Sequence, residues 1–397
     1  MVLLILRKSA KSLQLGLNEF LEQVQLPLVS KSAFSQARRH LKHTAFIELN
    51  QKAIVEVCYE DGQYRRFWDF RVLGIDGSKV ILPDNAAIYN EFGTVKRPSG
   101  RKGQAGRGQY SYMLVSVLYD VLNDISLDSR LGDTHSYEVD LAQQHLPYTQ
   151  ENDLLLQDRN YPTYRWLATL TQAQRHFVIR CSRSSFAQVR RMFAGQGTDS
   201  QLVSLKPSSE QRADILARDL PQSIQVRLVR LKLSNGDTEI LVTDLLDEQA
   251  YPTTEFGPLY HLRWGIETFF ARLKTRLSLE NFSGFSPEAV KQDFFATVFI
   301  TGLEALLTDT AEAHLQALSA HTQHTYQVNK AVSFNAIKNH VFELFYQETD
   351  PEVLLEKLTR LFLTNPTCVR PERQVSRRTA NFYRLFTFHK RKKKICF

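Results

Sequence analysis

Two short apolar runs, far apart in the chain, each lead to an aspartate, and this pair constrains the fold more than any other feature. Residues 71–75 form a β-type run that ends on Asp76, with a Gly-Ser turn expected after it. Residues 154–156 have the composition of a buried strand and lead to Asp158. The sequence therefore predicts two strands that each present a carboxylate at one end.

The segments around these strands alternate between the two kinds of secondary structure. Residues 109–131 contain two β-rich runs broken near Asn123, which predicts a hairpin. One helix is expected over 137–145, another over 164–170, and a further strand over 176–181. The order strand, hairpin, helix, strand, helix, strand predicts an α/β fold.

A later segment, residues 259–284, has the periodicity of one amphipathic helix. Its apolar residues fall within roughly 100° of arc, which predicts a core-facing surface. A second set, Tyr260, Arg263, Glu267 and Lys274, projects within roughly 60° on a neighbouring face by the same arithmetic. The spacing alone fits either a solvated helix edge or a functional stripe with a carboxylate among cations.

These four residues match, without a gap, the Tyr-x2-Arg-x3-Glu-x6-Lys signature of bacterial insertion-sequence transposases of the insertion-sequence-four type, which are DDE enzymes. The chain resembles this family over residues 34–328. The resemblance implies an RNase H-like catalytic core. It also implies that Asp76, Asp158 and Glu267 are the catalytic acid triad.

Two shorter motifs extend the resemblance. The family's first aspartate is usually followed by Gly-Thr or Gly-Ser, as in Asp76-Gly77-Ser78. Its second is followed by Arg and a short residue before an aromatic, as in Asp158-Arg159-Asn160-Tyr161. Asn160 stands where glycine is common, and Asn tolerates a left-handed backbone better than other non-glycine residues.

The expected chemistry is metal-dependent. Two divalent cations roughly 4 Å apart can stabilise the attacking and leaving oxygens of a phosphodiester. Carboxylate oxygens are hard ligands that suit Mg²⁺ or Mn²⁺. We therefore expect Asp76, Asp158 and Glu267 to be the metal ligands, holding two such ions.

DNA contacts are expected beside the acids. In the family, the positions of Tyr260, Arg263 and Lys274 grip phosphates of the transposon end, by hydrogen bond, bidentate fork and point charge respectively. Arg159 and Trp264 complete the expected DNA-binding set. Trp264 and Trp68 are candidates to stack on an unpaired base, and packing in the core is the alternative for both.

Charge favours a polyanionic partner, because 50 Lys and Arg exceed 42 Asp and Glu, which gives +8 at pH 7. Residues 370–397 hold ten Lys or Arg against one Glu, and residues 93–109 hold five cations and no acid. Both segments are expected to follow DNA phosphates, or else to be solvated.

Residues 30–41 predict an N-terminal helix with Ser32 as its N-cap. Arg38, Arg39 and His40 come late in this helix. They fit either a DNA-end reader of helix-turn-helix style or the preference of cations for a helix C-terminus.

The compartment expected is a reducing bacterial cytoplasm, with the protein at the nucleoid. The four cysteines lie far apart and form no Cys-x2-Cys pair, which argues against a zinc knuckle or a disulfide framework. The N-terminus lacks the pattern of a secretory signal. Residues 294–307 are too few to span a bilayer and contain Glu304, so a buried helix and no membrane partner are expected.

Five segments are expected along the chain. They are a helical DNA-binding module (1–65), the first part of the RNase H-like core (66–181), a β-rich insertion (182–251), the helix of the catalytic glutamate (252–310), and a helical C-terminal region with a basic tail (311–397). The insertion is indicated by a hairpin signal at Asn235-Gly236.

The function that these features predict is cut-and-paste DNA transposition. The resemblance implies that water nicks each element end to free a 3′-hydroxyl, which then attacks target DNA, and that the second strand is released through a hairpin. The expected partners are double-stranded terminal inverted repeats, target DNA and a second copy of the chain in the DNA complex. A non-catalytic DNA-binding derivative and a metal-dependent nuclease without strand transfer are the alternatives.

Overall fold

The computed structural model describes residues 1–7, 12–96, 108–320, 322–346 and 350–369. Most of the basic loop (97–107) and the basic tail (370–397) lie outside the described residues. The chain divides into two compact units. We call residues 61–79 and 114–270 the sheet unit, and residues 1–60, 80–113 and 271–397 the helical unit. The five-segment division stays a prediction.

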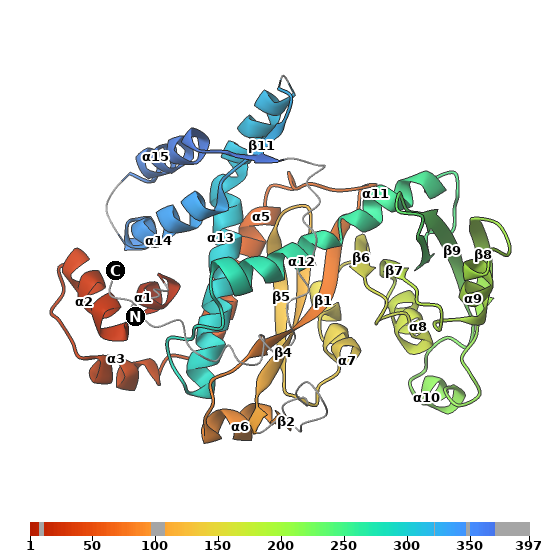
Figure 1. Ribbon diagram of the computed structural model, residues 1–397, viewed down its shortest axis with the longest axis horizontal. Coiled ribbons are helices and arrows are strands. Elements are labelled where there is room, and N and C mark those ends of the chain that lie inside the picture. The colour runs from red at the N-terminus through yellow and green to blue at the C-terminus, as the bar shows by residue number, and fades with distance from the viewer. Residues whose placement is uncertain (8–11, 97–107, 321, 347–349, 370–397) are drawn as a thin grey trace, which may run out of the picture. The chain divides into compact units, whose positions relative to one another are not determined.

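One mixed sheet of eight strands organises the fold, in the order β5-β4-β1-β6-β7-β10-β9-β8 (Figure 1). β1 pairs in parallel with β6, and β6 with β7, whereas β4–β5 is an antiparallel hairpin. The order β5-β4-β1-β6-β7 is that of an RNase H-like core, so the expected α/β fold is confirmed. The strands are β1 (Arg71–Ile81), β4 (Tyr112–Asp120), β5 (Ile125–Gly132), β6 (Asp153–Gln157), β7 (His176–Arg180), β8 (Ser200–Leu205), β9 (Ile224–Lys232) and β10 (Thr238–Thr243).

The strands of the expected insertion extend this same sheet. β10 pairs antiparallel with β7, β9 with β10, and β8 with β9. The Asn235-Gly236 signal correctly marks the β9–β10 turn, where Gly236 adopts a positive φ of 85°. The insertion is therefore continuous with the catalytic sheet through main-chain hydrogen bonds.

The first strand is longer than the sequence pattern predicts, because β1 covers Arg71–Ile81 and not only residues 71–75. β1 does not turn at Gly77-Ser78 but continues through Asp76 to Ile81. The strand remains extended because β4 is its neighbour on one side, while the pairing with β6 ends at Gly74. Asp76 therefore lies within a strand, just beyond its parallel-paired part.

Short helices complete the sheet unit. They are α7 (Glu138–Gln143), η3 (Leu146–Tyr148), α8 (Tyr164–Gln172), α9 (Ala187–Phe193), α10 (Arg212–Ala217), η4 (Thr253–Glu255), α11 (Phe256–His261) and α12 (Trp264–Ala271). α12 packs on the sheet, as Figure 1 shows, with the rings of Phe269 and Tyr119 4.5 Å apart between centroids. A Cβ on Gly74 would lie 3.3 Å from Ile266, so this glycine permits the close approach of α12.

Residues 259–284 do not form the single helix that the periodicity predicts. α11 and α12 are separated at Leu262–Arg263, and the turn is built on i to i−3 hydrogen bonds, such as Arg263 N to Tyr260 O at 3.1 Å. The α12 helix is then followed by η5 (Arg272–Arg276), a π-helical segment. Because such turns advance by angles other than 100° per residue, the expected single stripe is not continuous across them.

The helical unit is built around α13 (Pro287–Ser319), a 33-residue helix. Around it lie α1 (Val2–Leu6), α2 (Leu13–Gln23), α3 (Lys31–Arg38), α4 (Thr44–Asn50), η1 (Gln51–Val55), α5 (Glu56–Tyr59), α6 (Ala86–Phe92), β2 (Val95–Lys96), β3 (Gln109–Tyr110), β11 (Thr325–Gln327), α14 (Lys330–Tyr346), α15 (Pro351–Thr364) and β12 (Thr367–Val369).

The α13 helix is the core helix expected at 294–307, although it is much longer. Among the described residues it alone is long and apolar enough to cross a membrane, and 67% of its most apolar window is buried inside the protein. Its buried Glu304 accepts hydrogen bonds from Ser333 Oγ at 2.5 Å and Lys330 Nζ at 3.0 Å. The carboxylate is thus paired within the unit, as a buried charge requires.

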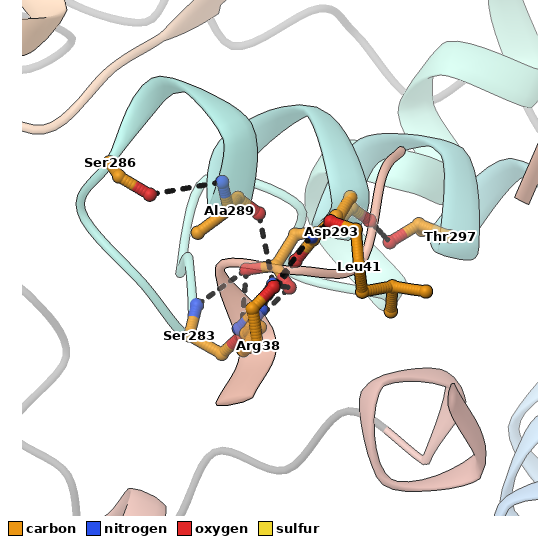
Figure 2. Close-up of polar contacts among 8 residues, drawn as sticks. Arg38, Leu41, Ser283, Ser286, Ala289, Asp293 and Thr297 are labelled. Atoms are coloured by element: carbon orange, nitrogen blue, oxygen red, sulfur yellow. Dashed lines mark hydrogen bonds and ion pairs between the residues drawn. The ribbon is translucent and has the colours of Figure 1, made fainter. Parts of the chain in front are cut away.

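Arg38 has a structural environment that the sequence did not indicate. Its guanidinium donates to Gln292 Oε1 at 2.5 Å, Asp293 Oδ1 at 2.8 Å and Ser283 Oγ at 2.6 Å, and it is 5% exposed (Figure 2). The side chain is therefore a buried bridge from α3 to the start of α13, which is inconsistent with a DNA contact. The N-cap also differs, because Ser30, and not Ser32, accepts from Ala33 N.

A buried ion pair fixes the register of the two central parallel strands. Arg71 and Asp153 are direct partners in the β1–β6 pairing. The guanidinium Nε donates to Oδ1 at 2.7 Å and Nη2 to Oδ2 at 2.6 Å, with side chains 6% and 1% exposed. A slip of one residue would separate these two buried charges, so the pair disfavours other registers.

We predict that Arg71→Met lowers the free energy of unfolding by about 3–5 kcal/mol, because it leaves the Asp153 carboxylate buried without its cation. The double variant Arg71→Met/Asp153→Asn should lose less than the sum of the two single changes. Urea denaturation of the four proteins measures this coupling. The exposed pair of Arg218 and Asp214 provides the control, and Arg218→Met should cost under about 1 kcal/mol. Additive losses at Arg71 and Asp153 would contradict the role assigned to the pair.

Candidate active site

The strand register brings the two predicted aspartates to equivalent positions. Gly74 of β1 pairs with Leu156 of β6. Asp76 follows Gly74 by two residues, and Asp158 follows Leu156 by two residues. Parallel strands run in the same direction, so equal steps lead to the same edge of the sheet. Both side chains are partly buried there.

Local hydrogen bonds orient both carboxylates. Gly77 N donates to Asp76 Oδ1 at 2.8 Å, and Asn160 N donates to Asp158 Oδ1 at 2.8 Å. Asn160 is not among the described residues with positive φ, so a left-handed backbone is not the reason for Asn at this position.

Burial and charge disfavour ionisation of Asp76. Desolvation raises the pKa of its carboxyl to about 7, and the nearby Asp158 and Glu138 carboxylates act in the same direction. The Gly77 N–H and the Arg263 guanidinium oppose this shift. A carboxyl with these neighbours gains from a cation placed beside it.

Glu138 is a fourth acid at this site, and the sequence motifs did not mark it. It is the first residue of α7, and a Cβ on Gly77 would lie 2.8 Å from its side chain. Asn160 Nδ2 lies 3.5 Å from Glu138 Oε2. Burial and the Asp158 charge both raise the pKa of Glu138. Only the fold brings Glu138 close to the two aspartates. In the sequence, the β4–β5 hairpin separates it from Asp76, and β6 separates it from Asp158.

Tyr161 is close enough to these acids for their charges to act on it. It is fully buried, and among the described residues its hydroxyl has no hydrogen-bond partner. Burial raises the pKa of this phenol, and the charges of Asp76, Glu138 and Asp158 raise it further. An unpaired buried hydroxyl costs free energy, which is typical of a group held ready for a ligand.

Glu267, the third predicted acid, is engaged with a cation from its own segment. Arg263 Nη2 donates to Glu267 Oε1 at 2.7 Å, and the guanidinium is 6% exposed. In the described part of the chain, no three His, Cys, Asp or Glu side chains converge closely enough to hold a metal ion. The structure thus brings Asp76, Asp158 and Glu138 close enough for their charges to interact, while Glu267 forms an ion pair with Arg263.

The donor chemistry nevertheless fits Mg²⁺ or Mn²⁺. All the side chains concerned offer hard carboxylate oxygens, which these ions prefer. The mutual repulsion at Asp76, together with the unpaired Tyr161 hydroxyl, would be relieved by a cation with its waters. The carboxylates therefore repel one another but would each be stabilised by such an ion.

The aromatic residues of the predicted DNA-binding set lie in different environments. Tyr260 is 4% exposed, and its hydroxyl donates to Gln157 O at 3.2 Å, so in this structure it anchors α11 to the end of β6 instead of facing a phosphate. Trp264 is 42% exposed, with Arg263 Cζ 5.2 Å from the ring centroid. Trp68 packs against Tyr251 and other aromatic rings, which favours the core alternative for this side chain.

The remaining two predicted contacts are cations. Arg159, directly after Asp158, is exposed and lines a polar hollow of about 640 Å³ in the sheet unit. Ser182, Ser185 and Lys206 also line this hollow, and none of the described residues in its lining is Asp or Glu. Lys274 lies in η5 and belongs to the helical unit.

A second polar cluster in the sheet unit has the composition of a hydrolase triad. His145 Nδ1 lies 2.7 Å from Asp128 Oδ2, and its Nε2 lies 3.0 Å from Ser116 Oγ. Ser116 and His145 are fully buried, so no substrate reaches the hydroxyl. This cluster is a satisfied buried network that joins β4, β5 and the end of α7.

We predict that the contribution of Asp76 to the stability of the metal-free protein falls as pH rises from about 4 to about 7. The folded Asp76 carboxyl keeps its proton up to about pH 7, whereas the unfolded one loses it near its ordinary pKa of 3.8. The folded state then binds more protons in this window, so rising pH favours unfolding. Asp76→Asn should flatten this part of the profile. Melting temperatures in EDTA across this range provide the measurement, and parallel profiles for the two proteins would count against the shift.

Comparison with known proteins gives a family match and related sequences. The profile described as "Transposase DDE domain" matches residues 68–303. The transposase InsG for insertion sequence element IS4 of Escherichia coli K12 is 24% identical over 286 residues, 70% of this chain and 61% of that protein. The putative transposase y4zB of Sinorhizobium fredii is 27% identical over 205 residues, 49% of this chain and 53% of that protein.

Among solved structures, a piggyBac transposase synaptic complex with hairpin DNA aligns with 96% of this chain and 77% of that chain, at a TM-score of 0.42 and 9% identity. The chain spans little more than half of the length of its two sequence relatives. The family profile, however, covers more than half of this chain and includes Asp76, Asp158 and Glu267. The protein therefore belongs to the transposase DDE domain family.

Proposed function

We propose that this chain is a DNA transposase that cuts the ends of a mobile element and joins them to target DNA. The observation that carries the proposal is the register match that sets Asp76 beside Asp158 at one sheet edge, within a chain of the DDE family. Both relatives are named as transposases, one of them for an insertion sequence.

The acids are assigned to cation binding. Asp76, Asp158 and Glu267 would hold two Mg²⁺ or Mn²⁺ ions, and Glu138 adds a fourth carboxylate beside the two aspartates. Such ions, when bound, stabilise negative charge on the attacking and leaving oxygens of a phosphodiester. Glu267 must then leave Arg263, which frees the guanidinium for a DNA phosphate.

The DNA contacts are assigned to the cations and to the exposed tryptophan. Arg263, Arg159 and Lys274 would bind phosphates, and Trp264 would stack on an unpaired base. The hollow beside Arg159 supports this assignment, because the described residues that line it include cations and several hydroxyls but no acid. The buried Tyr260 instead positions the segment before Asp158 through Gln157.

The proposed partners are terminal inverted repeats and target DNA, bound by two copies of the chain in the cytoplasm at the nucleoid. Strand transfer requires two element ends in one complex. Release of the second strand through a hairpin belongs to the same proposal.

We predict that Asp76→Asn, Asp158→Asn and Glu267→Gln each abolish cleavage while binding to the element end persists. Each amide preserves shape but removes a charged cation ligand. The substrate is a labelled duplex from DNA flanking the reading frame, incubated with Mg²⁺, and binding is followed by gel shift. Nicking at the wild-type rate by any one variant would remove that residue from the triad.

The same assay separates the alternative functions. A target plasmid added to the reaction should yield joined products with the wild-type protein. Nicked ends without joined products would indicate a nuclease. End binding without any cleavage would indicate a non-catalytic DNA-binding protein.

For Glu138, we predict that Glu138→Gln weakens Mn²⁺ binding by about tenfold in the absence of DNA, since a ligand charge near Asp76 is lost. Isothermal calorimetry on the free protein measures the affinity. Asp140→Asn is the matched control, because it lies on the same helix in an exposed ion pair with Arg165. Equal affinities for Glu138→Gln and Asp140→Asn would show that the fourth carboxylate takes no part.

A further inference from the structure

The strand β8 lies at one edge of the eight-stranded sheet, and Figure 1 shows it at the outer end of the sheet unit's strands. Among the described strands it pairs with β9 alone. Leu202, near the middle of β8, is 65% exposed, and Ser204 is exposed as well. An edge strand presents a row of main-chain N–H and C=O groups, so the outer side of β8 can accept a further strand.

The register with β9 determines which main-chain groups point outwards. Directly before β8, Asp199 O accepts a hydrogen bond from Arg230 N at 2.8 Å. Hydrogen-bonded and non-hydrogen-bonded residues alternate along an antiparallel pair. It follows that Ser200, Leu202 and Ser204 direct their N–H and C=O groups away from β9. In the described part of the chain, no residue hydrogen-bonds to the main chain of Leu202 or Ser204.

The β8 sequence has none of the features that usually protect an exposed edge. Residues 200–205 contain no charged residue and no proline. The β8–β9 register is continuous, without a bulge. Natural edge strands commonly carry at least one of these features, because they prevent pairing with another chain. The strand at the opposite edge, β5, differs in that residues 125–129 are all buried. An exposed edge without protection is typical of a strand that pairs in the assembled protein.

We propose that β8 pairs with β8 of a second copy of this chain, antiparallel about a two-fold axis at Leu202. A two-fold axis brings the same patch of both copies together. In this register Leu202 lies opposite the partner's Leu202, and Ser200 lies opposite the partner's Ser204. The outward N–H groups then meet carbonyls of the other copy, and the two exposed leucines cover each other. Ser200 O already accepts from Thr198 Oγ1 at 2.6 Å, but a carbonyl oxygen has two lone pairs.

Charges at the two ends of β8 favour the antiparallel arrangement. Asp199 precedes the strand and Lys206 follows it. Antiparallel pairing sets the acidic end of one strand beside the basic end of the other, whereas parallel pairing of two copies would bring like charges together. The second copy that DNA transposition requires thereby gains a contact surface. That role at DNA rests on the proposed function, but the pairing itself is expected without DNA.

Sedimentation equilibrium of the full chain without DNA, at about 1–100 µM, measures the self-association. The wild type should form a dimer reversibly. Leu202→Lys should raise the dissociation constant by about tenfold or more, because it places two like charges directly opposite each other. Leu216→Lys is the matched control, since Leu216 is also 65% exposed and lies in the same unit, and it should dimerise as the wild type does.

Leu202→Cys tests the register directly. Opposite residues of a hydrogen-bonded antiparallel pair have Cα atoms about 5.5 Å apart, which a disulfide can span. Mild oxidation should link two Leu202→Cys chains well above the background that the wild type and Leu216→Cys give. The proposal is overturned by a wild type that stays monomeric throughout the range, by a Leu202→Lys dimer as tight as the wild-type dimer, or by absence of the cross-link. Asp76→Asn should dimerise normally, which keeps this result distinct from the catalytic assignment.

Discussion

The parallel pairing of β1 with β6 is the constraint on which the proposed catalytic arrangement depends. It is fixed at one end by the buried pair of Arg71 and Asp153. At the other end, the same register sets Asp76 level with Asp158. Because side chains alternate between the two faces of a sheet, a slip of one residue would turn one aspartate away from the other. A structural ion pair thus determines the geometry of the proposed catalytic site on the same strands.

The acidic edge is electrostatically unfavourable in the metal-free protein. Asp76, Asp158 and Glu138 act on one another, and among the described residues the Tyr161 hydroxyl, which feels their charges, has no hydrogen-bond partner. The Arg263 guanidinium partly offsets the repulsion at Asp76, but its hydrogen bond goes to Glu267. Folding tolerates this arrangement because a large apolar core surrounds the central strands. A cation bound beside these carboxylates would therefore stabilise the site.

In the helical unit, polar and charged side chains are buried along the long apolar helix α13. Arg38 closes the start of α13 through Asp293 and Gln292, and Glu304 is paired further along with Lys330 and Ser333. Each buried charge has an opposite charge and additional hydrogen bonds, which offsets the loss of solvation.

The sequence by itself predicted the order of helices and strands along the chain, the strands that lead to both aspartates and, through its motif resemblance, the family, because periodicity and fixed spacings are local properties of the chain. It misplaced the end of β1 and the continuity of 259–284, where neighbouring strands and tight turns override the local pattern. Only the tertiary structure revealed the surroundings of Arg38, Glu138 and Tyr161. Their partners lie far away in sequence or are absent, and no spacing rule encodes a contact that forms when distant segments pack together.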